Sequence, residues 1–448
     1  MNDEPIRLHD GPLADPRTAE LLSDAALVRH LAEYARAWSL AQADAGLIPQ
    51  GAAAYIARVC ETFTPDFARL AAGTRDTGTP VAPFIAQLGA AVAALEPAAA
   101  AYVHWGATSQ DALDTAHVLQ RRAVLARIDA ILASVLGALS ALAHTYRHTP
   151  MLARTLLQTA EPTTFGLKVA RWHRGLADAR RGLADARRDA EVLQFGGASG
   201  TLAALGAQGI AVNEKVAELL GLALPSSPWH SDRLRVARLA AALGGLLGVG
   251  GKIARDVALL AQREVGELDE PWHPGRGASS AMPHKRNPVG CAGLLAAALR
   301  APGLVATLYG CLVQEHERAL GAWHAEWAPL AELLSLAAGA SVGLEALAVG
   351  LVVHPERMRR NLETTGGDWA ASGLAAALVV ALGREEAHAH VARLCAEAAA
   401  QRGPLHALAR TDAVVRRHLA PTDIDGLFDP TSRLAAVDAL MARALAED

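Results

Sequence analysis

Aromatic residues are scarce in this sequence. Phe, Tyr and Trp make up 4% of its 448 residues, although 52% of the residues are hydrophobic. The apolar residues are therefore mostly Ala and Leu, which favour helices, whereas sheets are rich in β-branched and aromatic residues. The composition predicts an all-α protein that is long enough for several domains.

Cysteine is also rare. The four cysteines are widely separated, and no two have the spacing of paired metal ligands. This pattern argues against a disulfide framework or a zinc site and fits a reducing compartment. The first ten residues have no apolar stretch typical of a signal peptide, and no apolar run of about 18 residues is free of charges and proline. We therefore expect a cytoplasmic protein with no metal ion and no membrane span.

Neither sign of charge predominates. The 42 Lys and Arg residues and the 46 Asp and Glu residues give a net charge of −4 at pH 7. Such a chain has no broad positive field, so we expect neither nucleic acids nor anionic membrane surfaces as partners.

Helical periodicity organises most of the chain. Ser23 has the character of an N-cap before the first helix. Longer helices are predicted over about 113–147, 162–193, 232–262, 289–316 and 323–351. These patterns predict a helical domain over residues 1–107, a long-helix bundle over 108–352 and a C-terminal helical domain over 353–448. Because no sheet covers the long apolar helices, we expect the chain to self-associate.

One long loop interrupts this pattern. Residues 264–288 read EVGELDEPWHPGRGASSAMPHKRNP. Gly and Pro at this density forbid a helix, and loops of this length in compact domains are usually functional or disordered. The segment also carries two adjacent serines, Ser279 and Ser280, close to Lys285 and Asn287. We expect it to be the active-site loop.

A second polar cluster, Thr108-Ser109-Gln110-Asp111, stands directly before the helix predicted over 113–147. Ser and Asp at this place are typical of helix capping. The alternative is that hydroxyls and backbone N–H groups at a helix N-terminus bind a carboxylate. In contrast, the glycine-rich segment GGASGTLAALG (196–206) has no strand before it, so no nucleotide site is predicted.

The motif SSAMPHKRNP (279–288) resembles the signature loop of the fumarase/aspartase superfamily, which includes adenylosuccinate lyase and argininosuccinate lyase. Three further blocks occur in the order and at about the spacing of that family: HWGATSQD, RTLLQTAEPTTFG and GASGTLAALG. The resemblance implies an all-α fold with a central long-helix bundle and a reaction without a cofactor. It also implies a homotetramer in which three subunits build each active site.

The resemblance implies roles for single residues. Ser280 matches the serine that removes a proton from carbon, and Lys285 and Asn287 match residues that hold the neighbouring substrate carboxylate. A free serine hydroxyl is too weak a base, so the site must stabilise its alkoxide. Further substrate-binding residues are implied at His104, Thr108, Ser109, Gln110, Arg154, Thr155, Gln158, His316 and Arg318. His144, His284 and Arg286 remain open between a role in the site and a structural or surface position.

Three features resemble one branch of the superfamily, the bacterial 3-carboxy-cis,cis-muconate cycloisomerases. The loop continues as NPVGCAG, with Ala292 where adenylosuccinate lyases usually have glutamate. The stretch QEHERALGAWHAEW (314–327) is similar to that region of the cycloisomerases. Leu156 occupies the position of the family's acid histidine.

The chemistry of the leaving group agrees with Leu156. Expelling hydroxide or an amine requires a general acid, whereas the carboxylate that leaves a muconolactone departs as a stable anion. The resemblance, which this chemistry supports, therefore implies a lactonising cycloisomerase that acts on a tricarboxylate in the protocatechuate branch of the β-ketoadipate pathway. The alternatives are a C–N lyase similar to adenylosuccinate lyase and an inactive helical scaffold.

Overall fold

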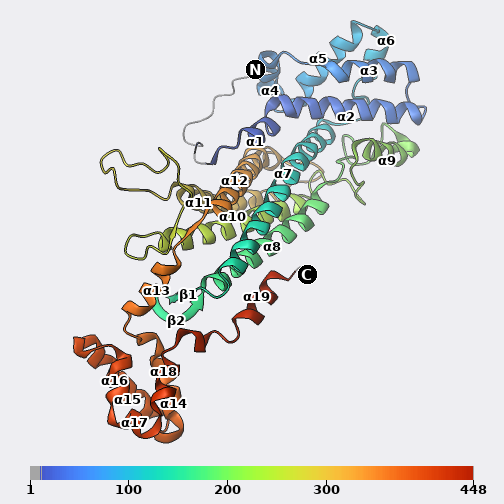
Figure 1. The fold of residues 1–448 in the computed structure, drawn as a ribbon. Coiled ribbons are helices and arrows are strands. Elements are labelled where there is room, and N and C mark those ends of the chain that lie inside the picture. Colours follow the sequence, from blue (N-terminus) through green and yellow to red (C-terminus); the bar gives the residue numbers. More distant parts are fainter. Residues whose placement is uncertain (1–10, 12, 447–448) are drawn as a thin grey trace. The chain divides into compact units, whose positions relative to one another are not determined.

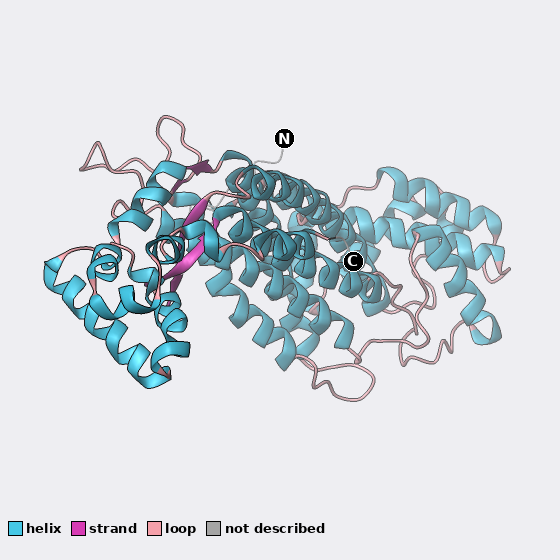
Figure 2. Cartoon of the chain, turned by 60° about the horizontal axis from the view of Figure 1, so that its bottom comes forward, coloured by secondary structure: helices cyan, strands magenta, loops and turns pink. Residues whose placement is uncertain are grey.

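The computed structural model describes residue 11 and residues 13–446. The ten N-terminal residues, where the absence of a signal peptide was predicted, lie outside the described residues. The chain forms two compact units. One comprises Met1–Leu132, Ala179–Gly250 and Gly293–Gly343, and the other comprises Ala133–Asp178, Gly251–Ala292 and Leu344–Asp448. Helices dominate the described chain (Figure 2), which confirms the all-α prediction. The three-domain division stays a prediction.

The N-terminal part of the first unit is a set of short and medium helices. Ser23 caps α2, because its Oγ accepts the backbone N–H of Ala26 at 3.2 Å. Tyr34 and Trp38 lie one turn apart on the buried face of α2 and stack on each other. The helices are α1 (Pro16–Leu21), α2 (Asp24–Asp44), α3 (Gln50–Thr62), α4 (Phe67–Thr77), α5 (Val81–Ala93) and α6 (Pro97–Ala100).

The long helices were predicted well, apart from their ends (Figure 1). They are α7 (Ser109–Thr145), α8 (Phe165–Ala190), α10 (Leu234–Leu260), α11 (Val289–Gly310) and α12 (Ala322–Gly350). The shorter η2 (Gly206–Gln208) and α9 (Gly209–Leu220) follow the glycine-rich segment. Pro302 lies inside α11 and Pro329 lies inside α12, and each helix continues through its proline.

The helix start predicted at about residue 162, in the block RTLLQTAEPTTFG, is wrong. Residues 150–164 form an antiparallel hairpin of β1 (Pro150–Thr155) and β2 (Gln158–Thr164), and α8 begins only at Phe165. Leu156 and Leu157 form its two-residue turn with φ of 51° and 64°, the sign that a type I′ hairpin turn requires. Pro162 lies in β2, where a two-stranded ribbon tolerates its missing N–H.

Short helices complete the second unit (Figure 1). A buried cluster that includes Leu374, Val391 and Leu405 forms their core. The elements are α13 (Pro355–Thr364), η3 (Asp368–Ala370), α14 (Ala371–Leu382), α15 (Arg384–Glu397), η4 (Ala398–Arg402), α16 (Leu405–Thr411), α17 (Ala413–His418), α18 (Pro421–Leu427), η5 (Pro430–Arg433) and α19 (Val437–Leu445).

Among the described residues, four helices, α7, α10, α11 and α12, are long and apolar enough to cross a membrane by length and composition alone. The stricter sequence criterion, which allowed no charge or proline, had not identified them. Two of these helices carry buried acids, Asp114 on α7 and Glu326 on α12, which pair with Arg233 inside the first unit. The most apolar 18-residue stretch of α7 is only 33% buried, and that of α11 is only 28% buried. This single chain therefore leaves much apolar helix surface uncovered.

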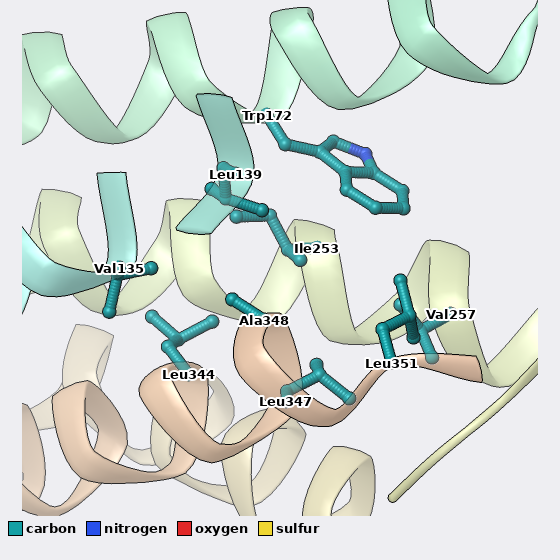
Figure 3. Close-up of a pocket in the computed structure, with 9 residues that line it drawn as sticks. All are labelled: Val135, Leu139, Trp172, Ile253, Val257, Leu344, Leu347, Ala348 and Leu351. Atoms are coloured by element: carbon teal, nitrogen blue, oxygen red, sulfur yellow. The ribbon is translucent and has the colours of Figure 1, made fainter. Parts of the chain in front are cut away.

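The core of the second unit contains a small apolar void of about 10 Å³ (Figure 3). Trp172, Ile253 and Leu347 are among the nine side chains around it, and all nine are apolar. A void of this size and polarity has neither the room nor the polar partners to hold a carboxylate substrate. It reflects helix packing, and the candidate site lies elsewhere.

Candidate active site

The signature loop is irregular, as predicted. Between α10 and α11 its regular pairing is limited to β3 (Leu268–Asp269) against β4 (Val352–Val353) and one bridge between Ala278 and Arg286. Ser280 and Lys285 are both exposed. Within the described residues, neither side chain has a hydrogen bond or an ion pair. The predicted proton carrier and the predicted cation are therefore free to meet a ligand.

The base of the loop is held firmly. The carboxylate of Glu270 accepts the backbone N–H groups of Gly290 at 3.0 Å and Cys291 at 2.5 Å, at the N-terminus of α11. The carbonyl of Gly277 accepts both the backbone N–H of Asn287 at 2.9 Å and its side-chain amide at 3.1 Å. Gly277 has φ of 65°, and a Cβ there would lie 2.3 Å from the carbonyl oxygen of Asn287. Only glycine fits this position.

These contacts separate a fixed base from an apex at residues 278–286. Asn287, which the family resemblance assigns to a substrate carboxylate, holds the loop base in this conformation. Ser279 folds the apex, since its Oγ accepts the backbone N–H of Met282 at 3.1 Å. The guanidinium of Arg286 lies over the ring of Trp272, 4.6 Å from its centre, which supports the structural alternative for Arg286.

Arg154 is engaged with a buried acid. Its two terminal nitrogens donate to the two carboxylate oxygens of Glu267 at 3.0 and 2.8 Å, and Glu267 is 0% exposed. The side-chain amide of Asn361 on α13 donates to the same carboxylate at 2.7 Å. Arg154 therefore joins the β1–β2 hairpin to the base of the signature loop. A direct role in substrate binding requires it to share or leave this ion pair.

The hairpin tip is exposed. Thr155 and Gln158, both predicted in the site, flank the turn on its two strands. The tip itself is apolar, with Leu156 97% exposed and Leu157 73% exposed. Neither leucine has a proton to give, so the turn supplies no general acid.

The first block lies in the first unit, where α7 begins at Ser109. The carboxylate of Asp111, in the first turn, accepts the backbone N–H of Thr108 at 3.0 Å, which confirms the capping interpretation of Asp111. Arg318 donates from one terminal nitrogen to Thr108 Oγ1 at 2.9 Å. Its Nε is buried without a partner within the described residues. The structure thus brings two predicted site residues, Thr108 and Arg318, into direct contact.

Gln110 is less accessible than the prediction implies. Its side chain is 1% exposed, and its amide nitrogen donates to the carbonyl of His230 at 2.8 Å and to Asp114 at 3.2 Å. Its amide oxygen is buried without a partner in the described part of the chain. Ser109, next to it, is partly exposed. Ser109 is therefore better placed than Gln110 to meet a ligand.

The two predicted histidines of this unit differ. His104 has φ of 61°, and burial lowers the pKa of its imidazole to about 4 although Asp111 opposes the shift. It is therefore neutral at pH 7, with a buried Nδ1 that has no partner among the described residues. His316 has φ of 48° and is exposed. His144 bonds to the carbonyl of Ser140 in its own helix at 2.8 Å, which supports a structural role for it.

Sequence analysis missed a buried ionic cluster beside this block. Arg233 pairs with Asp114 at 2.7 Å and with Glu326 at 2.7 Å, and all three side chains are about 1% exposed. Burial alone would raise the pKa of Asp114, but Arg233, Gln194 and Trp323 hold it well below its usual value. Charged residues within otherwise apolar helices were the only signal for this cluster.

The pKa of Glu326 is shifted upward, whereas that of Asp114 is shifted downward, although both acids contact Arg233. Burial raises the pKa of Glu326, and the nearby charge of Asp114 adds to this rise; together they outweigh the lowering by Arg233 and Arg121. Asp114 has three additional donors, the Gln194 amide at 3.0 Å, the Trp323 indole at 3.0 Å and the Gln110 amide at 3.2 Å, whereas Glu326 has one, the Gln314 amide at 3.2 Å. The extra donors account for the difference, because hydrogen bonds to the charged form favour that form.

Comparison with known proteins identifies the family. A family model described as "Lyase" matches residues 11–303, and one described as "Adenylosuccinate lyase C-terminus" matches residues 369–444. A 3-carboxy-cis,cis-muconate cycloisomerase of Pseudomonas aeruginosa is 44% identical over 448 residues, which cover 100% of this chain and 98% of the relative. A nitrosuccinate lyase of Streptomyces davaonensis is 44% identical over 434 residues, which cover 95% of this chain and 91% of the relative.

A solved structure agrees with these relatives. The crystal structure of the 3-carboxy-cis,cis-muconate lactonizing enzyme from Pseudomonas putida matches with a TM-score of 0.91 at 40% identity, and the match covers 98% of both chains. The signature loop and the three other sequence blocks are present in the order expected of the family. The chain therefore belongs to the lyase family of the fumarase/aspartase superfamily.

Proposed function

We propose that this chain is a soluble, cytoplasmic enzyme that converts 3-carboxy-cis,cis-muconate to its lactone in protocatechuate breakdown. Relatives that carry this activity in their names are 41–44% identical over almost the whole chain. The observation that carries the choice of leaving group is Leu156, an apolar residue at the position that the family resemblance gives to the acid. A reaction that breaks or forms a bond to a carboxylate oxygen needs no acid there.

The proposed reaction forms one C–O bond and one C–H bond. A substrate carboxylate oxygen attacks the conjugated double bond, and the electron pair moves to the carbon next to another carboxylate, giving an aci-carboxylate dianion. Ser280 then gives its hydroxyl proton to that carbon. Lys285 lies five residues away on the same loop, and its fixed charge stabilises both the dianion and the resulting alkoxide. Water returns the proton to Ser280.

The carboxylates that do not react need binding groups of their own. Thr108 and Ser109, at the N-terminus of α7, are proposed to bind one of them. Arg318, already in contact with Thr108, and His316 are proposed for the third carboxylate, since a tricarboxylate requires more than one cation.

A second candidate is the elimination of nitrite from nitrosuccinate. The relative named nitrosuccinate lyase is 44% identical, so overall identity does not separate the two functions. Nitrite, like a carboxylate, leaves as a stable anion, and Leu156 therefore fits this reaction as well. Leu156 argues against an amine leaving group, as in adenylosuccinate.

A substrate panel distinguishes these functions. The purified protein is incubated separately with 3-carboxy-cis,cis-muconate, nitrosuccinate and adenylosuccinate, and ultraviolet absorbance and released nitrite are followed. We expect kcat/KM for the muconate to exceed that for either succinate on the order of 10²-fold or more. Preferential nitrite release would favour the second candidate. Turnover of adenylosuccinate alone would contradict the argument from Leu156. No turnover of any of the three substrates would favour an inactive scaffold.

We also propose that the active enzyme is a homotetramer and that each site takes its three blocks from three copies. Two findings support assembly. The most apolar stretches of α7 and α11 are mostly not buried within one chain. Leu156 and Leu157 combine high exposure with left-handed backbone, which costs roughly 1 kcal/mol or more at each residue. Burial of these surfaces against another copy would offset the exposure of apolar side chains and the backbone strain at the turn.

Complementation tests the shared site. Thr108→Ala and Ser280→Ala subunits are each expected to be nearly inactive, because each lacks one part of every site. Unfolding and refolding them together is expected to restore measurable activity, since some mixed sites draw intact parts from different copies. Each variant refolded alone is the control. A mixture no more active than its two components would show that each site uses one chain.

A further inference from the structure

One carboxylate in the first unit ties together three separate segments. Asp111 is 1% exposed. Its Oδ2 accepts the backbone N–H of Thr108 at 3.0 Å and that of Gly197 at 3.0 Å. Its Oδ1 lies 2.7 Å from Nε2 of His230. A carboxylate only accepts hydrogen bonds, so His230 presents Nε2–H to it.

The three partners come from distant parts of the sequence. Thr108 belongs to the first block, Gly197 opens the glycine-rich third block, and His230 lies in the segment before α10. Arg318 adds a second tie between the same two blocks. It donates to Thr108 Oγ1 at 2.9 Å and to the carbonyls of Gly197 and Ala198 at 3.4 and 3.2 Å. The turn at Thr108 is therefore fixed from its backbone side and from its side-chain side.

Asp111 does more than a helix cap requires. A residue in the first turn that reaches back to one backbone N–H is sufficient for capping. Here the same carboxylate also fixes a second loop and a buried histidine. The cost is electrostatic, because a buried negative charge stands directly behind the turn proposed to receive an anionic substrate. The donated Nε2–H of His230 offsets part of that charge.

The contacts of Asp111 do not occupy the first backbone N–H groups of α7. Asp111 takes the N–H of Thr108, whereas the N–H groups of Ser109 and Gln110 have no acceptor within the described part of the chain. Such unpaired N–H groups at a helix start suit a carboxylate. Their directions depend on how the turn at Thr108 is held.

We propose that Asp111 and His230 form a positioning pair that sets the turn at Thr108–Ser109 for a spectator carboxylate of the substrate. The inference rests on the proposed function for the identity of that carboxylate. It assigns no contact between the pair and the substrate. The pair acts through the backbone of Thr108 and through the glycine-rich loop at Gly197.

A spectator carboxylate has the same charge in the ground state and in the transition state. Loss of the positioning pair should therefore raise KM more than it lowers kcat. We expect Asp111→Ala to raise KM for 3-carboxymuconate on the order of 10-fold to 10²-fold, with a smaller loss in kcat. Asp111→Asn should recover most of the loss, because its amide oxygen can still accept both N–H groups.

Asp66→Ala is the matched control. Asp66 caps α4 in the same unit, where its carboxylate accepts the backbone N–H of Arg69 at 3.0 Å. We expect it to lower the midpoint of denaturation and to leave KM unchanged. If Asp111→Ala fails to fold, His230→Leu provides the comparison, because it removes the histidine donor and keeps the cap.

Equilibrium binding separates this inference from the proposed function. Affinity for tricarballylate, a saturated tricarboxylate, is measured by calorimetry on folded variants, so no turnover is needed. Weaker binding in Asp111→Ala or His230→Leu than in Asp66→Ala supports the positioning pair even if the wild type does not turn over the muconate. Affinity and KM both within about twofold of the wild type would overturn the pair and leave the proposed function standing.

Discussion

Replacing Ser280 with Ala is expected to lower kcat about 10²-fold to 10⁴-fold, the range typical of losing a positioned proton-transfer group. Alanine cannot give a proton to the dianion or take one in the reverse direction. Ser280 is exposed and has no hydrogen bond within the described residues, so the fold and the assembly should be unchanged. Steady-state kinetics measures the loss in kcat. Thermal unfolding and sedimentation check that the fold and the assembly are unchanged.

The neighbouring serine provides the control. Ser279 Oγ accepts backbone N–H groups of Ala281 and Met282 at 3.4 and 3.1 Å, so it shapes the apex of the loop. Ser279→Ala should therefore cost much less in kcat than Ser280→Ala. Equal losses would mean that the proton carrier has been assigned to the wrong serine or that the loop acts only as a whole.

Replacing Arg233 with Met is expected to destabilise the protein by about 3–5 kcal/mol, because it leaves two buried carboxylates without their cation. Arg233, Asp114 and Glu326 are all nearly inaccessible to solvent. Chemical denaturation measures the loss. Arg238→Met is the control, since its ion pair with Asp189 is more than half exposed and such pairs contribute about 0–1 kcal/mol.

The destabilisation should depend on pH. The pKa of Asp114 is lowered in the folded protein, so the stability from its ionised form is present above its unfolded pKa of about 3.9 and is lost on further acidification. The pKa of Glu326 is raised, so it is protonated at a higher pH than in the unfolded chain. Without Arg233, protonation removes the buried negative charge of each acid and so stabilises the folded variant. The stability difference between variant and wild type should therefore shrink as pH falls from 7 toward 5, and a constant difference would argue against an ionic cluster.

Helix periodicity and loop composition were the most predictable features of the fold. Leu and Ala at helical spacing located the long helices, and glycine and proline located the signature loop over 264–288. Local chemistry determines both, so neither requires knowledge of distant contacts. Asp111 as a first-turn capping residue was predictable for the same reason.

The β1–β2 hairpin was not predictable from local preference. Leu156 and Leu157 at its turn hold φ values that favour Gly, Asn or Asp, and Pro162 suggested a helix start. Tertiary context overrides both preferences, since Arg154 on β1 is fixed by the buried Glu267. The hairpin also alters the argument from Leu156, which lies at an exposed tip and not inside a pocket of its own chain.

The ionic cluster and the Asp111–His230 pair depend on residues more than ninety positions apart. Arg233 is 119 residues from Asp114, and His230 is 119 residues from Asp111. A sequence pattern identifies the acids on α7 but not the partners that meet them. For the same reason, the family resemblance identified Arg154 and Gln110 but not the acid and the carbonyl that occupy their side chains.

The identity of the product tests the central claim most directly. 3-Carboxy-cis,cis-muconate is converted in D₂O by the wild-type enzyme, and the product is examined by proton and deuterium NMR. We predict a carboxymuconolactone with one deuterium on the carbon next to a carboxylate, and formation of this product that is about 10²-fold or more slower with Ser280→Ala. Recovery of unchanged muconate from the wild type, together with nitrite release from nitrosuccinate, would contradict the claim.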